Sequence, residues 1–135
     1  MSLEIAQRER EGIIIFDLKG RITMGNEVST FRAAFDTVSE SPGTRLILNM
    51  HEIDYVDSTG LGALVMCSTR FKKSDGIVKL LNVNRRNIEL ILMTKIDTIF
   101  ELFDDETDAV NSFFPGRAIR RFDLLSFVQK MRQDP

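Results

Sequence analysis

Short apolar segments of two kinds alternate along this 135-residue chain, and their alternation limits the fold more than any other feature. Residues 13–18 form a β-branched run, and residues 46–48 are apolar on both faces, as in a parallel strand at the centre of a sheet. Between such segments, apolar residues recur every three or four positions, which is typical of amphipathic helices. Alternating strands and helices predict an α/β domain with a mixed sheet.

The predicted elements follow one another with turn signals between them. We expect an N-terminal hairpin closed by Glu11 and Gly12, and a helix capped by Asn84. Acidic residues at 104–108 favour the start of a further helix, where the dipole stabilises negative charge; an acidic docking patch is the alternative. The sequence predicts a four- to five-stranded sheet packed by about four helices: strands near 3–7, 13–18, 46–48, 77–81 and 99–103, and helices near 28–38, 60–71, 84–94 and from about 104.

The last part of the chain has a different character. After the break at Pro115 and Gly116, apolar residues repeat every three positions among basic ones, which predicts a basic amphipathic helix. We therefore divide the chain into a core domain, 1–112, and a C-terminal extension, 113–135. A solvated face is the simplest interpretation of the basic side. The apolar side needs cover, so we also expect a homodimer or a docked partner. The repeat consists of Ile119, Phe122, Leu125 and Val128, with Arg117, Arg120, Arg121, Lys130 and Arg132 interspersed.

Composition excludes several function classes. The net charge of -2 and pI near 5.4 give no electrostatic reason for direct nucleic-acid binding. The single cysteine, Cys67, excludes an internal disulfide and a four-cysteine zinc site, and we expect it to be a small core residue. With His51 as the only histidine, we predict neither a metal nor a cofactor. No apolar run is long enough to span a bilayer, and no signal-peptide core is present, so we expect a cytoplasmic protein.

The most informative stretch joins an apolar strand to the second helix, at residues 53–64. In an α/β sheet, ligand contacts gather beyond the carboxyl ends of the strands, where this loop should lie. Ser58 is placed to cap the helix, with its hydroxyl near the unpaired backbone N–H groups of the first turn. Gly60 and Gly62 weaken the helix by roughly 1 kcal/mol each relative to alanine. Either this turn packs closely on the sheet, or a bare surface there lets another protein approach.

Residues Asp57-Ser58-Thr59-Gly60-Leu61-Gly62 resemble the signature of the STAS domain, a family that includes bacterial anti-sigma factor antagonists and parts of anion transporters. The likeness extends over residues 3–112, because the hairpin, the turn at 20–22 and the strand at 46–48 occur in the family's order. It implies that Ser58 is phosphorylated by a partner anti-sigma factor that is itself a serine kinase. It also implies that the unphosphorylated form binds this partner, and that a phosphatase resets Ser58.

The sequence departs from the family at two places, and the residues around the motif are our candidates for partner contacts. Thr59 follows Ser58 where many relatives have serine or alanine, so Thr59 is the second choice of acceptor. We expect Thr23 and Asn49 to lie in loops near the motif. Both are neutral, whereas relatives have acidic residues at these positions. The expected contact residues are Thr23, Asn26, Tyr55, Asp57, Ser58, Thr59, Gly60 and Gly62.

Enzymatic interpretations fit the residues poorly, so we predict that the chain is not an enzyme. A nucleophile elbow would need glycine at Val56, and His51 precedes Ser58 instead of following it. No Gly-Lys-Ser/Thr sequence marks a nucleotide site, and the early strands end without the acidic pair of a phospho-aspartate receiver. We expect a phosphorylation-switched regulator of sigma-dependent transcription. The alternative is a STAS subunit of a lipid or anion transport assembly or of a stress-sensing complex.

Overall fold

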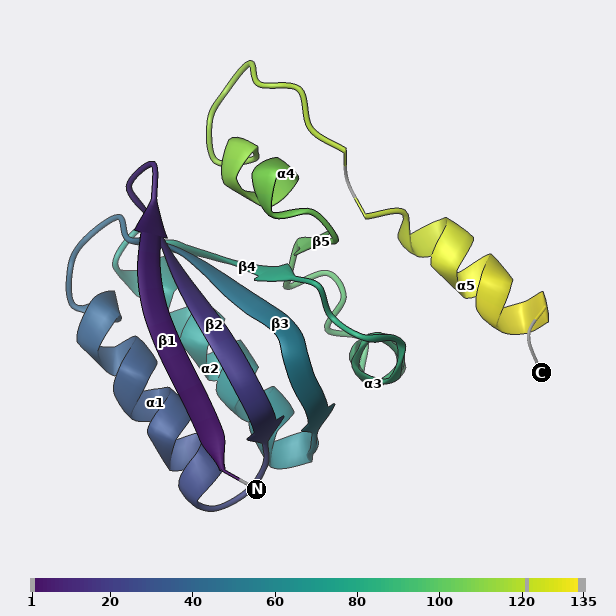
Figure 1. Cartoon of the computed structure of the whole chain (residues 1–135), viewed down its shortest axis with the longest axis horizontal. Coiled ribbons are helices and arrows are strands. Elements are labelled where there is room, and N and C mark those ends of the chain that lie inside the picture. Colours follow the sequence, from purple (N-terminus) through teal and green to yellow (C-terminus); the bar gives the residue numbers. More distant parts are fainter. Residues whose placement is uncertain (1, 121, 134–135) are drawn as a thin grey trace.

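The computed structural model describes residues 2–120 and 122–133, and within these ranges the chain forms one five-stranded sheet and five helices. The strands lie in the order β1-β2-β3-β4-β5, with β1 antiparallel to β2 and all other neighbours parallel. The predicted mixed α/β fold is confirmed (Figure 1). The strands are β1 Leu3–Arg10, β2 Ile13–Ile22, β3 Arg45–Val56, β4 Ile77–Leu81 and β5 Leu102–Phe103; the helices are α1 Asn26–Ser39, α2 Ser58–Lys73, α3 Arg85–Met93, α4 Glu106–Asn111 and α5 Leu124–Gln133.

The hairpin of β1 and β2 closes through the predicted pair Glu11 and Gly12. Both residues have positive φ, 51° and 80°, which is the conformation of the two-residue turn whose twist matches that of paired strands. Glycine adopts this conformation without steric cost. The side chain of Glu11 accepts hydrogen bonds from Arg117, so the turn is also tied to the segment after α4.

Helices α1 and α2 lie against one face of the sheet (Figure 1) and enclose the larger core. Phe31 and Phe35 of α1 are fully buried and meet edge to face, with ring centroids 5.2 Å apart. Burial of each such side chain contributes about 1.5–3 kcal/mol. Cys67 lies in this core as predicted, and burial raises the pKa of its thiol. The same core holds β2 and β3 rigidly under the start of α2.

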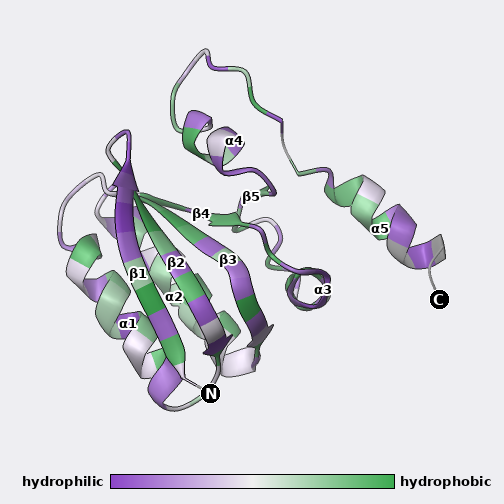
Figure 2. Ribbon diagram, in the orientation of Figure 1, coloured by the Kyte–Doolittle hydropathy of each residue, from purple (hydrophilic) through white to green (hydrophobic). Residues whose placement is uncertain are grey.

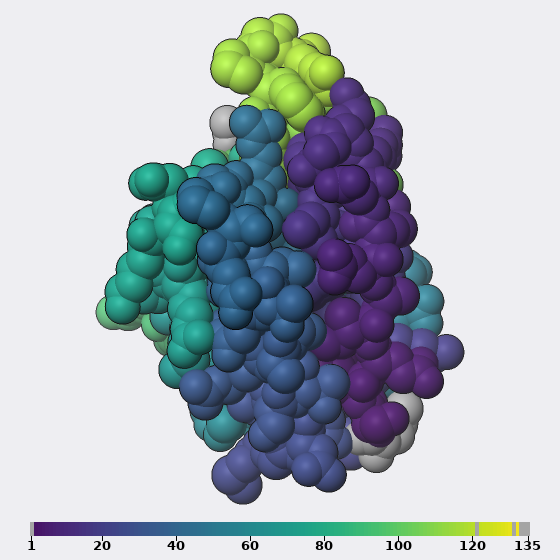
Figure 3. All heavy atoms as spheres, turned by 90° about the vertical axis from the view of Figure 1, so that its left-hand side faces the viewer, coloured from purple at the N-terminus to yellow at the C-terminus, as the bar shows by residue number. Residues whose placement is uncertain are grey.

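A second, smaller core covers part of the opposite face. Helix α4 and the segment that follows it pack over the hairpin end of the sheet, and Figure 3 shows this segment above α1 and β1. Lys79 of β4 is buried there, where its ammonium donates to Ser112 Oγ at 2.8 Å and lies over the ring of Phe113. The buried members of this second core are Ile13, Ile15, Ile47, Leu81, Phe103, Ala109 and Val110, with Phe113, Phe114 and Ile119 packed against them.

Strand β5 is shorter than the predicted strand at 99–103. Only Leu102 and Phe103 pair with β4, since a turn holds the preceding residues, with the amide of Ile99 donating to Ile96 O at 3.0 Å. Phe100 is buried while Ile99 is 40% exposed. The turn therefore leaves an apolar side chain and a short strand at this edge of the sheet.

The C-terminal helix also begins later than the three-residue repeat predicts. Ile119 packs into the second core and Phe122 precedes the helix, so the prediction is wrong for both, while Leu125 and Val128 lie on α5. The cause is a cap at Asp123, whose carboxylate accepts hydrogen bonds from the amide and hydroxyl of Ser126 at 3.0 and 2.7 Å. Arg121 lies outside the described residues. Figure 2 shows that the first part of α5 is mostly hydrophobic and its later part mostly hydrophilic.

No helix within residues 2–120 and 122–133 is both long enough and apolar enough to cross a membrane.

An ion-pair network should make the stability of this fold depend on acid. The hydrogen bond from Arg8 lowers the pKa of Glu106, and Arg10 lowers it further through a bond of 2.8 Å. A carboxyl group whose pKa is lower in the folded state stabilises the protein above its unfolded pKa, near 4.3, and this stabilisation is lost as the pH falls through the folded pKa. Because these side chains are partly exposed, we expect Glu106→Gln to lower the free energy of unfolding by roughly 0.5–1 kcal/mol at pH 7.

Urea unfolding at a series of pH values measures this effect. The difference between wild type and Glu106→Gln should be present at neutral pH and disappear below the folded pKa of Glu106. Glu40→Gln is the matched control, because Glu40 is exposed and has no ion-pair partner in the described ranges. A difference that stays constant down to the acid limit would contradict the assignment to Glu106.

Candidate functional site

The start of α2 is built around the carboxylate of Asp57. Asp57 follows β3 in an extended conformation, and its Oδ1 accepts a hydrogen bond from the amide of Gly60 at 2.7 Å. Its Oδ2 accepts one from the amide of Met24 at 2.9 Å, in the loop between β2 and α1. One side chain therefore caps α2 and fixes the neighbouring loop against it.

The prediction that Ser58 caps α2 is wrong, since Asp57 is the cap and Ser58 is the first helical residue. A cap must accept from an amide two or three residues later, and Asp57 already does so. The hydroxyls of Ser58 and Thr59 are exposed and make no hydrogen bond to any other described residue. By contrast, the hydroxyls of Thr69 and Thr94 bond to backbone carbonyls within their helices. The correction leaves Ser58 free at the surface.

Gly60 and Gly62 have different reasons to be glycine. A Cβ on Gly60 would lie 1.9 Å from the carbonyl oxygen of Ile22, so the first turn of α2 sits directly on the end of β2. A Cβ on Gly62 would meet nothing within 4 Å, and this residue is exposed. Close packing explains Gly60, and an open surface beside Ser58 describes Gly62. The sequence offered these two explanations as alternatives for both glycines.

The expected contact residues in the loop between β2 and α1 lie beside the first turn of α2. Thr23 and Asn26 flank Met24, whose amide bonds to Asp57, and Asn26 is exposed at the start of α1. The side chain of Met24 is 74% exposed. Asn49, in contrast, is not in a loop near the motif: it lies within β3, and its amide donates to Asp17 Oδ1 at 2.8 Å.

Tyr55 marks the other side of the site, where β3 meets α3. The guanidinium of Arg86 stacks over the Tyr55 ring, 4.7 Å from its centroid, and Arg86 has no ion-pair partner in the described part of the chain. Asn84 caps α3 as predicted and also donates to the carbonyl of Ile53 at 3.0 Å, which fixes α3 beside β3. Between them lies a depression of about 200 Å³, lined by Tyr55, Val56, Asp57, Arg86, Asn87, Glu89, Leu90 and Met93.

Sequence reasoning missed Met24, Arg86 and Met93 as members of this surface. Met93 is 80% exposed at the end of α3, and its exposure is unusual for so large an apolar side chain. An apolar residue between Thr23 and Gly25 in a turn was the available signal for Met24. Nothing in the local sequence indicates that Arg86 meets Tyr55, because the contact joins two elements. No group of three His, Cys, Asp or Glu side chains within the described ranges is arranged to hold a metal ion.

Comparison with known proteins places this geometry in a family. A sequence model of the STAS domain matches residues 4–109. The chain belongs to the STAS domain family. The membership inferred from Asp57–Gly62 is therefore confirmed, and the matched region ends before α5.

Individual relatives agree with this assignment. The sequence is 28% identical over 102 residues to the anti-sigma-B factor antagonist of Bacillus subtilis (strain 168), covering 76% of this chain and 92% of that protein. The fold resembles an anti-sigma factor antagonist from Mycobacterium paratuberculosis, with a TM-score of 0.72, 20% identity, and coverage of 82% and 93% of the two chains. It also resembles a sulfate transporter family protein from Wolinella succinogenes, with a TM-score of 0.62, 24% identity, and coverage of 73% and 81%.

The two glycines of this STAS domain provide a matched test of the geometry. Gly60→Ala should lower the free energy of unfolding by roughly 1–3 kcal/mol, because the added methyl group overlaps a backbone carbonyl that cannot move freely. Gly62→Ala should instead raise it by up to about 1 kcal/mol, because alanine is the better helix former where space is open. Urea unfolding of both variants measures the difference. Equal effects would contradict the close contact of Gly60 with β2.

Proposed function

We propose that this STAS domain is an anti-sigma factor antagonist whose binding is switched at Ser58. In its unphosphorylated form it binds a serine-kinase anti-sigma factor in the cytoplasm, and this sequestration regulates sigma-dependent transcription. The binding module is the core domain, 1–112. The observation that carries the proposal is the hydroxyl of Ser58, the exposed first residue of α2, which makes no hydrogen bond to any other residue that the structure describes. The similarity to the Bacillus subtilis antagonist supports the partner class.

Several exposed apolar side chains come from the elements next to Ser58 and suit a protein partner. Met24 and Met93 are 74% and 80% exposed, and Tyr55 and Met66 are 37% and 38% exposed. Met66 lies two turns after Ser58 on the same side of α2, with Gly62 between them. We call the surface formed by Met24, Tyr55, Ser58, Gly62, Met66 and Met93 the α2 docking face. Flexible methionine side chains adapt to a partner's contour, and the bare Gly62 permits close approach.

Phosphorylation would change the charge of this face without changing the fold. A phosphate on Ser58 adds about −1.5 to −2 charge at pH 7, next to the Asp57 carboxylate. The positive end of the α2 dipole stabilises an exposed negative group by typically 0.3–1 kcal/mol, which compensates only part of the cost of this charge. Burying the remaining charge against an apolar partner is costly. Because Asp57 and Gly60 hold α2 in place independently of Ser58, binding is lost while the scaffold stays intact.

The switch needs two further partners. The anti-sigma factor itself acts as the kinase, so it reaches the hydroxyl from the same face that it binds. A phosphatase that removes the phosphate from Ser58 returns the protein to its binding form. Thr59 is the second choice of acceptor, since its hydroxyl is also exposed and makes no hydrogen bond to another described residue.

The alternative keeps the fold and changes the partner. As a STAS subunit of a lipid or anion transport assembly or a stress-sensing complex, the chain would share the fold of the Wolinella succinogenes protein. That function does not require a serine kinase to bind the α2 docking face. Incubation with ATP and candidate kinases separates the two functions.

Two substitutions at Ser58 test the switch. Ser58→Ala should bind the anti-sigma factor about as tightly as wild type and accept no phosphate there, whereas Ser58→Glu should bind roughly tenfold more weakly or worse, a loss of at least about 1.4 kcal/mol. Calorimetry measures binding, and peptide mass after incubation with ATP locates the phosphate. Thr59→Ala should still be phosphorylated. Equal affinities for Ser58→Ala and Ser58→Glu would exclude the switch.

Two control variants separate the charge effect from general damage. Ser41→Glu adds the same charge in the exposed turn after α1 and should leave binding unchanged. Gly62→Ala keeps the charge and, as argued above, does not harm the fold, so any loss of binding reports close approach of the partner. Weaker binding by Ser41→Glu would instead indicate an effect of net charge.

A further inference from the structure

Helix α5 has a capped start but makes few contacts with the other described elements beyond its first residue. The cap at Asp123 begins it, and Leu125 on its surface is 69% exposed. Isolated helices shorter than about 12–15 residues are marginal in water, so a ten-residue helix normally depends on packing of its apolar side. Figure 1 shows α5 extending away from the sheet and from the helices that cover it.

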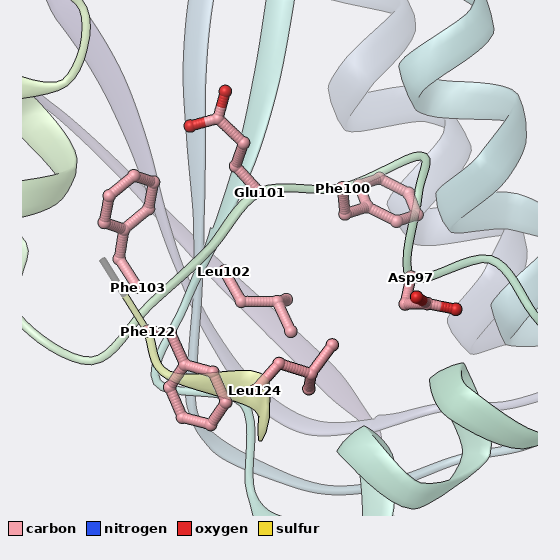
Figure 4. Close-up of a pocket in the computed structure, with 7 residues that line it drawn as sticks. All are labelled: Asp97, Phe100, Glu101, Leu102, Phe103, Phe122 and Leu124. Carbon is pink, nitrogen blue, oxygen red and sulfur yellow. The ribbon is translucent and has the colours of Figure 1, made fainter. Parts of the chain in front are cut away.

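The chain approaches the edge of the sheet just before α5. Phe122 and Leu124 line one side of a cavity of about 160 Å³, and the segment that leads into β5 lines the other. In Figure 4, Leu102 and Leu124 point into the space between these two segments. Beyond Leu124 the helix leaves this edge. The exposed Ile99 therefore lies near a surface that the tail reaches but does not cover.

The two segments that meet at this apolar surface also carry opposite net charges. Residues 97–108 contain six acidic and no basic side chains, whereas residues 117–132 contain five basic and one acidic. Where the two segments meet within one chain they attract: the amide of Arg120 donates to Asp108 Oδ1 at 3.2 Å, and its guanidinium lies 3.7 Å from the same carboxylate.

Charges of both signs remain unpaired farther along the two segments. Asp97 and Asp104, on either side of β5, have no cationic partner among the described residues. Lys130 and Arg132 on α5 are exposed and likewise have no anionic partner there. Arg132 lies two turns after Leu125 on the same side of the helix. The basic and apolar residues of α5 therefore match the acidic and apolar residues of the β5 edge.

We propose that a second copy of this chain supplies the cover, so that α5 of each copy lies along residues 97–104 of the other. The chain's own helix is anchored at Leu124 and points away, so the edge it suits is that of a neighbour. Two-fold exchange makes the contact self-complementary and buries both tails. Self-association of this kind goes beyond the proposed switch at Ser58, whose surface it does not use.

A charge exchange tests this pairing on the full-length chain. Asp97→Lys with Asp104→Lys gives a basic edge beside a basic tail, and Lys130→Glu with Arg132→Glu gives an acidic tail beside an acidic edge. Sedimentation velocity should show a concentration-dependent dimer for wild type and loss of that dimer for each double variant alone. An equimolar mixture of the two double variants should restore it, because each tail then faces an edge of opposite charge. Added salt should weaken the wild-type dimer.

Further variants keep the test decisive. Leu125→Asp should abolish the dimer, because it places a charge in the apolar contact between α5 and the β5 edge. Lys72→Glu with Lys73→Glu, a matched charge change at the exposed end of α2, should leave the dimer unchanged. Circular dichroism verifies that each variant is folded. A wild-type chain that stays monomeric at every concentration overturns the proposal, and so does a mixture that fails to re-form the dimer. Binding assays with Ser58 variants are independent of either result.

Discussion

The hydrogen bonds made by the Asp57 carboxylate are the constraint on which the site depends. One oxygen caps α2 through Gly60, and the other holds the β2–α1 loop through Met24. Two segments more than thirty residues apart thus become one surface. The close contact of Gly60 with Ile22 reinforces the arrangement, since it seats the first turn of α2 on the strand itself. Loss of a carboxylate here would free both the helix end and the loop.

The residues that hold α2 in place are different from the residue of the proposed switch. Asp57 and Gly60 contact the end of β2 and the adjoining loop, whereas Ser58 lies one position after Asp57, Gly62 lies two positions after Gly60, and both are exposed. Because a helix turns by about 100° per residue, Ser58 and Gly62 lie on roughly the opposite side of α2 from Gly60. In the proposed switch, a charge added at Ser58 therefore acts on the partner and leaves the Asp57 cap in place. A serine that served as the cap itself would couple phosphorylation to the stability of α2.

Local sequence patterns predicted most of the fold, because strand and helix periodicities depend on nearby residues. They located Asn84 as a cap and Cys67 as a core residue, and the hexapeptide at Asp57 identified the family. They failed where distant contacts decide the outcome. The three-residue repeat placed Ile119 on a helix, but packing against the sheet takes it into the second core. The stacking of Arg86 on Tyr55 likewise joins two elements whose proximity no local pattern reveals.

The two cores support the surfaces of the two proposals separately. The larger core fixes the end of β2, the end of β3 and the start of α2, so the backbone that carries Ser58 is held in place. The second core holds the chain only as far as Ile119, and Arg120 still pairs with Asp108. Past that point Phe122 and Leu124 still line a cavity at the β5 edge, and Lys130 and Arg132 of α5 have no anionic partner among the described residues. The proposed switch and the proposed dimer contact therefore rest on different supports: Ser58 on the start of α2, and the dimer contact on residues 97–104 and α5.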